Sequence, residues 1–160
     1  MFRYYSLCLY CLLFGLLIAG CSEKLDPEEK AAKERNEIIK SAPINIDYKI
    51  NPPEENVPEN IKAFSGRWVG KWNDAFPSQL VVTNISRNQA TFIYSWASIP
   101  QRGIEAGEVE KTVNISSDGK IEFEIDSVIT SFVFNPVLNK IIGAKINGEE
   151  VSNIVMEKVK

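Results

Sequence analysis

The stretch FSGRWVGKW, residues 64–72, alternates apolar and polar side chains with a period of two residues. Successive side chains of a β-strand point to opposite faces of the sheet, so Trp68, Gly70 and Trp72 share one face while Lys71 points the other way. This pattern predicts a strand whose tryptophan face is buried and whose lysine face meets water.

The same alternation continues outward from this stretch to the end of the chain. Short apolar runs are separated by turn residues, and the Asn147-Gly148 pair is a strong signal for a two-residue hairpin turn with positive φ. Almost nothing follows helical spacing. Eight strands are expected, over residues 63–73, 79–86, 89–97, 106–115, 120–126, 128–134, 138–146 and 149–158.

The faces of these strands can be sorted by the same period. Phe92, Tyr94 and Trp96 fall on one buried face, and Ile121, Phe123 and Ile125 form another such stripe. The opposite faces are expected to be solvated, through Lys71, Ser95, Glu122 and Glu124. The strand over 128–134 is apolar on both faces, which indicates an outer face that is either covered or exposed as a patch.

Consecutive hairpins predict that strands adjacent in sequence pair in space. Eight antiparallel strands joined in this way leave two open edges unless the sheet closes on itself. The predicted fold is therefore all-β, a small eight-stranded antiparallel up-and-down barrel over residues 61–160, with a two-sheet sandwich as the alternative.

The first strand resembles the glycine-x-tryptophan signature that opens the barrel of lipocalin-like proteins. The matching residues are Gly66 and Trp68, followed by Gly70 and Trp72. This loose resemblance implies a non-catalytic barrel in which Gly66 lets the chain bend and Trp68 plugs one end. Any ligand would then enter at the opposite end.

The N-terminus is typical of a secreted protein. Residues 1–20 carry one early basic side chain, then an apolar run shorter than the roughly 20 residues of a membrane-spanning helix, and end in Ala19 and Gly20 before Cys21. The sequence LIAGC, residues 17–21, resembles the lipobox of bacterial lipoproteins, which implies cleavage before Cys21 and acylation of Cys21. The alternative is an ordinary secretory signal with an incidental cysteine. Ser22 resembles the residue that sorts such lipoproteins to the outer membrane.

Residues 21–60 have the composition of a lipid-anchored tether. Asp26 and Pro27 predict the start of a helix over 27–40, whose apolar stripe is too thin to bury much. Prolines, asparagines and glutamates follow to residue 60, a composition that favours extended, solvated chain. Such a tether would hold the barrel on the order of 80 Å from the bilayer.

Composition excludes several classes of function. The chain of 160 residues has 18 basic and 21 acidic side chains, a formal charge of -3 and no histidine, so nucleic acid is not expected as a partner. Without histidine it lacks the usual general base and the Ser-His-Asp and Cys-His pairs. Cys8 and Cys11 lie in the predicted signal, which leaves Cys21 alone and allows no disulfide within the mature chain. We expect no enzyme activity and no cofactor.

Aromatic side chains are the candidates for ligand binding. Trp72, Tyr94 and Trp96 could line a pocket for a small apolar or glycan ligand, and Arg102, in the long connection after Trp96, could meet an anionic group. The alternative for the aromatic residues is core packing, because a barrel of this size needs large side chains to fill it. The predicted function is thus a membrane-anchored envelope lipoprotein that binds such a ligand, or alternatively a solid barrel scaffold for an envelope protein partner.

Overall fold

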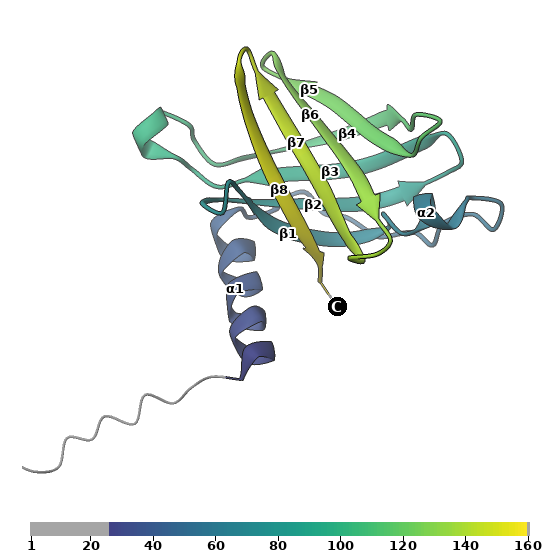
Figure 1. Ribbon diagram of the computed structural model, residues 1–160, viewed down its shortest axis with the longest axis horizontal. Helices are drawn as coiled ribbons and strands as arrows, with labels where there is room; N and C mark the ends of the chain where they lie inside the picture. Colours follow the sequence, from purple (N-terminus) through teal and green to yellow (C-terminus); the bar gives the residue numbers. More distant parts are fainter. Residues whose placement is uncertain (1–25, 160) are drawn as a thin grey trace, which may run out of the picture.

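The computed structural model describes residues 26–159, and its main feature is one sheet of eight antiparallel strands rolled into a nearly closed barrel (Figure 1). The predicted eight-stranded up-and-down barrel is therefore confirmed. The strands are β1 (Gly66–Trp72), β2 (Phe76–Ile85), β3 (Gln89–Trp96), β4 (Gly107–Asn114), β5 (Lys120–Ile125), β6 (Val128–Asn135), β7 (Lys140–Asn147) and β8 (Glu150–Lys158).

The strand order is β4-β3-β2-β1-β8-β7-β6-β5. The first and last strands of the chain close the sheet, since residues 68–70 of β1 pair with residues 156–158 of β8. β4 and β5 are the two edges, and an isolated bridge between Ile115 and Ile121 joins the chain beside them. The barrel is thus complete except along the β4–β5 seam.

The turn between β7 and β8 lies one residue further along the chain than predicted. Asn147 pairs with Glu150, so the two loop residues are Gly148 and Glu149, and Gly148 has φ of 58°. Glycine adopts this left-handed conformation without the steric cost that a Cβ atom brings, which explains its place at the first loop position.

Large side chains fill the barrel interior. The predicted inward stripes are confirmed in β3 and β5, where Phe92, Tyr94, Ile121 and Phe123 are buried. Aromatic rings from several strands meet at the centre, including Phe92 with Phe123 at a centroid distance of 4.9 Å. Further fully buried side chains are those of Phe64, Leu80, Ile85, Phe132, Ile141, Ile154 and Met156.

One end of the barrel is closed by Trp68 and by the chain that enters β1. The Trp68 indole is fully buried, and its Nε1 donates a hydrogen bond to the carbonyl oxygen of Phe64 at 2.7 Å. A short helix that the sequence pattern did not predict, α2 (Glu59–Lys62), brings Ile61 against the same core, together with Val57. Trp68 therefore plugs this end, as the resemblance implied.

The N-terminal helix α1 (Pro27–Ser41) forms close to the predicted bounds, and Asp26 caps it by accepting a hydrogen bond from the Glu28 N–H at 3.0 Å. Contrary to expectation, its last turn packs on the outside of the barrel. Ile38 and Ala42 are buried there against β1 and β2. No helix among residues 26–159 combines the length and apolar character needed to cross a membrane.

The chain after α1 also runs along the barrel, which corrects the expectation of a solvated, extended spacer over residues 41–60. The Ser95 hydroxyl donates to the Ala42 carbonyl at 2.8 Å, and the Asn51 N–H donates to the Thr83 carbonyl at 2.8 Å. Ser95 is therefore fully buried, which contradicts the prediction that it lies on a solvated face. The physical reason is that Val69, Val81 and Ile93 point outward from three neighbouring strands, β1, β2 and β3, and need a cover.

Candidate functional site

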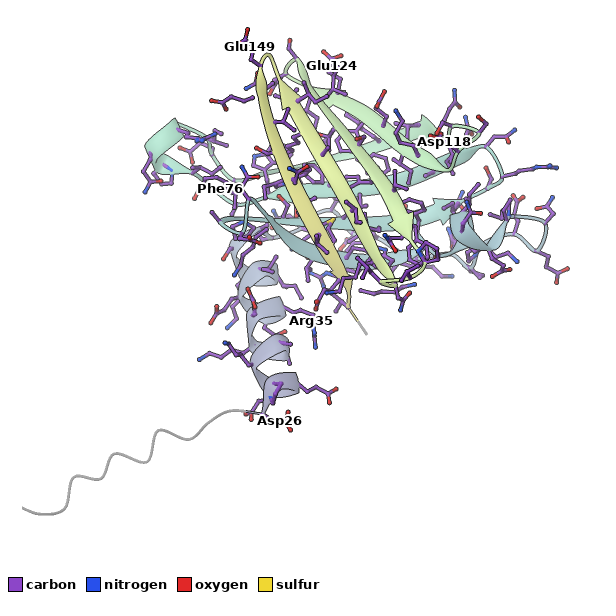
Figure 2. All side chains as sticks on the ribbon, viewed as in Figure 1. Asp26, Arg35, Phe76, Asp118, Glu124 and Glu149 are labelled. Atoms are coloured by element: carbon purple, nitrogen blue, oxygen red, sulfur yellow. The ribbon has the colours of Figure 1, made fainter. Side chains whose placement is uncertain are left out.

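The four residues predicted for ligand binding lie toward the barrel end opposite Trp68. Trp72 ends β1, Tyr94 and Trp96 lie near the end of β3, and Arg102 belongs to the short helix η1 (Pro100–Arg102) between β3 and β4. Phe76 and Glu149 mark this end in Figure 2. We call it the mouth of the barrel.

Trp72 and Tyr94 belong to the packed core and do not form an open wall. Both side chains are almost completely buried. The Trp72 Nε1 donates to the Tyr94 hydroxyl at 2.9 Å, and the Ser78 hydroxyl lies 3.2 Å from the same oxygen. These partners satisfy the polar atoms of both rings, so the pair stabilises the interior below the mouth.

Trp96 is half-buried and fixes the connection between β3 and β4. Its ring stacks on Tyr94 at a centroid distance of 5.8 Å, and its Nε1 donates to the Glu105 carbonyl at 2.9 Å. Gly107 lies directly against the indole, where a Cβ atom would come within 2.5 Å of the ring. A glycine is needed there because any larger residue would displace the tryptophan.

Arg102 is exposed at the rim of the mouth. Its guanidinium carbon lies 5.4 Å from the centroid of the Phe76 ring, and its Nη1 lies 3.8 Å from Glu150 Oε2. Both contacts are at the surface, where such interactions contribute little to stability. Arg102 is thus placed to meet a ligand at the mouth, but not one inside the barrel.

Lys145 of β7 joins this cluster, although the sequence interpretation did not identify it. Its Nζ lies 4.6 Å from the Trp72 ring centroid and 5.1 Å from that of Tyr94, within cation–π range. Two positions further back, Gly143 faces the interior and touches Phe132 and Ile154. The alternation of side chains along β7 would have been sufficient to identify Lys145, because it places this residue on the inward face.

Two open hollows lie on the outside of the barrel in the described part of the chain. One, of about 230 Å³, lies between α1 and strands β1 and β8, and another, of about 410 Å³, lies on α1 alone. Charged side chains surround the first hollow: Glu157 accepts from Lys140 at 2.7 Å and from Arg35 at 3.4 Å. These ion pairs join α1 to β7 and β8.

The carboxylates of β4 and β5 lie on the outer face of the barrel. Glu108 accepts a hydrogen bond from the Asn45 N–H at 2.8 Å, so it holds the chain that covers the barrel. Glu122 and Glu124 are exposed on the outer face of β5, as predicted. Among residues 26–159 there is no group of three or more acidic, cysteine or histidine side chains arranged to hold a metal ion.

The outer surface of β6, β7 and β8 carries the largest set of exposed apolar side chains. Cross-strand pairing places them in two rows, Val133–Ile142–Val155 and Ile129–Ile146–Val151, each running across the three strands. Between the rows lie Ser131, Ala144 and Asn153. Each of the six aliphatic side chains is between 38% and 59% exposed. We call these six residues the β6–β8 face.

Comparisons with known proteins add no relative. No model of a protein family matches the sequence, and neither do the curated proteins or the solved structures that were compared with it. The features that bear on function are therefore the mouth, the filled interior and the β6–β8 face.

Proposed function

We propose that this protein is a lipid-anchored envelope lipoprotein whose solid, non-catalytic barrel is a scaffold for protein–protein interaction. The filled interior is the observation that supports this function best. Trp72, Tyr94, Phe123 and Phe132 occupy the space that a ligand would need below the mouth. Ligand-binding barrels keep a pocket of roughly 300 Å³ or more for that purpose.

The outside of the barrel supports the same proposal. One side is covered by α1 and the chain after it, whereas the β6–β8 face presents aliphatic side chains to solvent. Exposed apolar patches of this kind are typical of interaction surfaces. A scaffold needs such a surface and needs no cavity.

The anchor in this proposal is Cys21, which lies outside the described residues. Its support is the lipobox-like sequence LIAGC and the polar segment that follows it. Each methylene buried in the bilayer contributes about 0.8 kcal/mol, so two or three acyl chains would hold the protein firmly. Ser22 favours the outer membrane as its location.

The anchor is tested by Cys21→Ser in the full chain. We expect the variant to lose incorporation of a labelled fatty acid and to accumulate as uncleaved precursor. Cys11→Ser is the matched control, because it removes a cysteine from the predicted signal and leaves the lipobox intact. Absence of label on the unsubstituted protein would overturn the anchor.

Binding of a small apolar or glycan ligand at the mouth is the second candidate function. It is favoured by Trp96, Arg102 and Lys145, which combine a half-buried ring with two cations. All three tryptophans lie in the barrel, so their emission reports on this site. The scaffold proposal expects no saturable change in emission with envelope lipids or glycans. A saturable change that Trp96→Ala abolishes would establish ligand binding instead.

A further inference from the structure

The six side chains of the β6–β8 face are uncharged. Beyond the Val133–Ile142–Val155 row the same strands continue with Lys140 and Glu157, which pair with each other at 2.7 Å. The two sides of the face carry different charges. Beside β6, the outer face of β5 carries Glu122 and Glu124 against Lys120. On the other side, α1 and β1 lie beside β8. Arg35 of α1 pairs with Glu157 of β8, and Lys71 of β1 pairs with Glu34 of α1. The β5 side therefore carries one carboxylate in excess, Glu124, whereas the cations of the α1 side are balanced by carboxylates in ion pairs.

We propose that the partner on the β6–β8 face is a second copy of this chain, related by a two-fold axis that runs along the strands, so that β7 packs on β7. The proposal rests on the scaffold function and on its membrane anchor. In this arrangement the row Val133–Ile142–Val155 meets the same row of the second copy in reverse order. A face without charge can oppose itself without electrostatic repulsion, as an isologous contact requires.

The charges at the sides decide the direction of the axis. An axis along the strands places the acidic β5 side of each copy on the same side as the charge-balanced α1 side of the other. An axis across the strands would place the two acidic β5 sides opposite each other, which like charges disfavour. Electrostatics therefore favours the parallel arrangement.

The same arrangement suits two copies anchored in one bilayer. Figure 1 looks onto β6, β7 and β8, while α1 runs from the barrel toward the N-terminus in the plane of the view. The outward direction of the β6–β8 face is thus roughly perpendicular to the axis of α1. An axis along the strands sends both α1 helices in the same direction, toward the same membrane.

The membrane surface itself is a poorer partner for this face. Segments that lie in the lipid interface combine an apolar face with tryptophan or tyrosine side chains and with a basic margin. The β6–β8 face consists of isoleucine and valine, and the neighbouring strand β5 is acidic on its outer face. It matches another aliphatic sheet face better, since sheets pack at about 10 Å with interdigitated side chains.

The size of the face explains why membrane anchoring matters. Three strands about 4.8 Å apart, with about seven residues rising 3.3 Å each, give a footprint of roughly 14 by 23 Å. Stable soluble complexes bury about 800 Å² per partner, more than this convex face offers. Confinement to one bilayer raises the effective concentration of the second copy and so compensates for the small contact.

Photo-crosslinking of the full chain in its membrane tests the proposal. A photoreactive amino acid at Ile142, on the two-fold axis, is expected to give a crosslinked pair of identical chains. The matched control is the same group at Thr112, an exposed position on the outer face of β4. Equal yields of the homodimer at both positions would overturn the proposal.

Charge substitution separates dimerisation from loss of folding. Ile142→Lys and Ile142→Glu each place like charges across the axis, so each variant alone should lose the dimer about tenfold or more. Co-expression of the two variants should restore it, because the charges then oppose each other. Failure of the mixed pair to associate, with both variants folded by circular dichroism, would overturn the two-fold contact.

The outcomes also distinguish this proposal from the scaffold function. Crosslinking at Ile142 to a different envelope protein would overturn the dimer and leave the scaffold in place. Crosslinking to lipid alone would overturn the dimer in favour of a membrane contact. A saturable ligand response at the mouth would overturn the scaffold function while the homodimer persisted.

Discussion

Two tryptophans that were both predicted on the inward face of a strand have different physical roles in this barrel. Trp68 is fully buried, hydrogen-bonded to Phe64 and packed edge-on against Phe134 at a centroid distance of 6.1 Å. Trp96 is half-buried and holds a connecting loop. The difference depends on position along the barrel axis, at the plugged end for Trp68 and at the mouth for Trp96.

Trp68→Ala is expected to lower the free energy of unfolding by roughly 3 to 5 kcal/mol, because removal of a buried ring leaves a cavity that its neighbours cannot fill. Trp96→Ala should cost less, since part of its ring already contacts water. Urea denaturation followed by circular dichroism measures both. Equal costs for the two variants would show that Trp96 is as deeply packed as Trp68.

At the scale of elements, the sequence pattern predicted the strands but not what covers them. The two-residue alternation located all eight strands to within a few residues, because one buried face is sufficient to produce it. The helix α1 was found from its Asp26 cap. Its docking could not be predicted, since a single Ile38 at the end of a polar helix gives no signal of what it will contact.

For the candidate site too, the sequence predicted which residues share a face but not how they pack. Alternation brought Trp72, Tyr94 and Trp96 together on the inward face, and the structure places them in one cluster with Lys145. Whether that cluster encloses a cavity depends on how rings from different strands pack, such as Phe123 against Tyr94. That packing is a tertiary property which no single strand encodes.

The contact between α1 and β8 should depend on pH. The Lys140 ammonium, and after it the Arg35 guanidinium, hold the pKa of the Glu157 carboxyl below its ordinary value of 4.5. A pKa that is lower in the folded protein stabilises the fold at pH values above 4.5, and this contribution is lost as the pH falls through the folded pKa. The two ion pairs then break together.

Urea unfolding at pH 7 and in the range from pH 4.5 to 3 measures this effect. The unsubstituted protein should lose more stability on acidification than Glu157→Gln, which already lacks the charge. Glu124→Gln, on the exposed outer face of β5, is the control and should follow the unsubstituted protein. Identical acid sensitivity of the Glu157→Gln variant would mean that the ion pairs of Glu157 do not contribute to the stability of the fold.

At the scale of the whole molecule, the folding unit begins before the barrel. Val69, Val81 and Ile93 point outward from β1, β2 and β3 and are nonetheless buried. Their cover comes from α1 and the chain after it, where Gln79 also donates its amide to the Ile39 carbonyl at 3.2 Å. Residues 42–57 thus add little reach, and α1 itself extends only about 22 Å.

This arrangement changes what is expected of a shortened chain. The composition of residues 21–60 predicts that a chain beginning near Ile61 folds alone as a soluble monomer. The structure predicts the opposite for that chain, because it would expose Val69, Val81 and Ile93 together and leave the buried Gln79 amide and Ser95 hydroxyl without their partner at Ala42. A chain beginning at Asp26 retains these contacts and should fold.

Size-exclusion chromatography with light scattering and urea unfolding of both chains distinguish the two expectations. The chain from Asp26 should be monomeric without its anchor, because the β6–β8 face alone is small, and it should unfold in one cooperative transition. The chain from Ile61 should aggregate or unfold at a lower urea concentration. If it were instead monomeric with an unchanged midpoint, the outward valines would tolerate water, and residues 26–60 would be a tether that merely rests on the barrel.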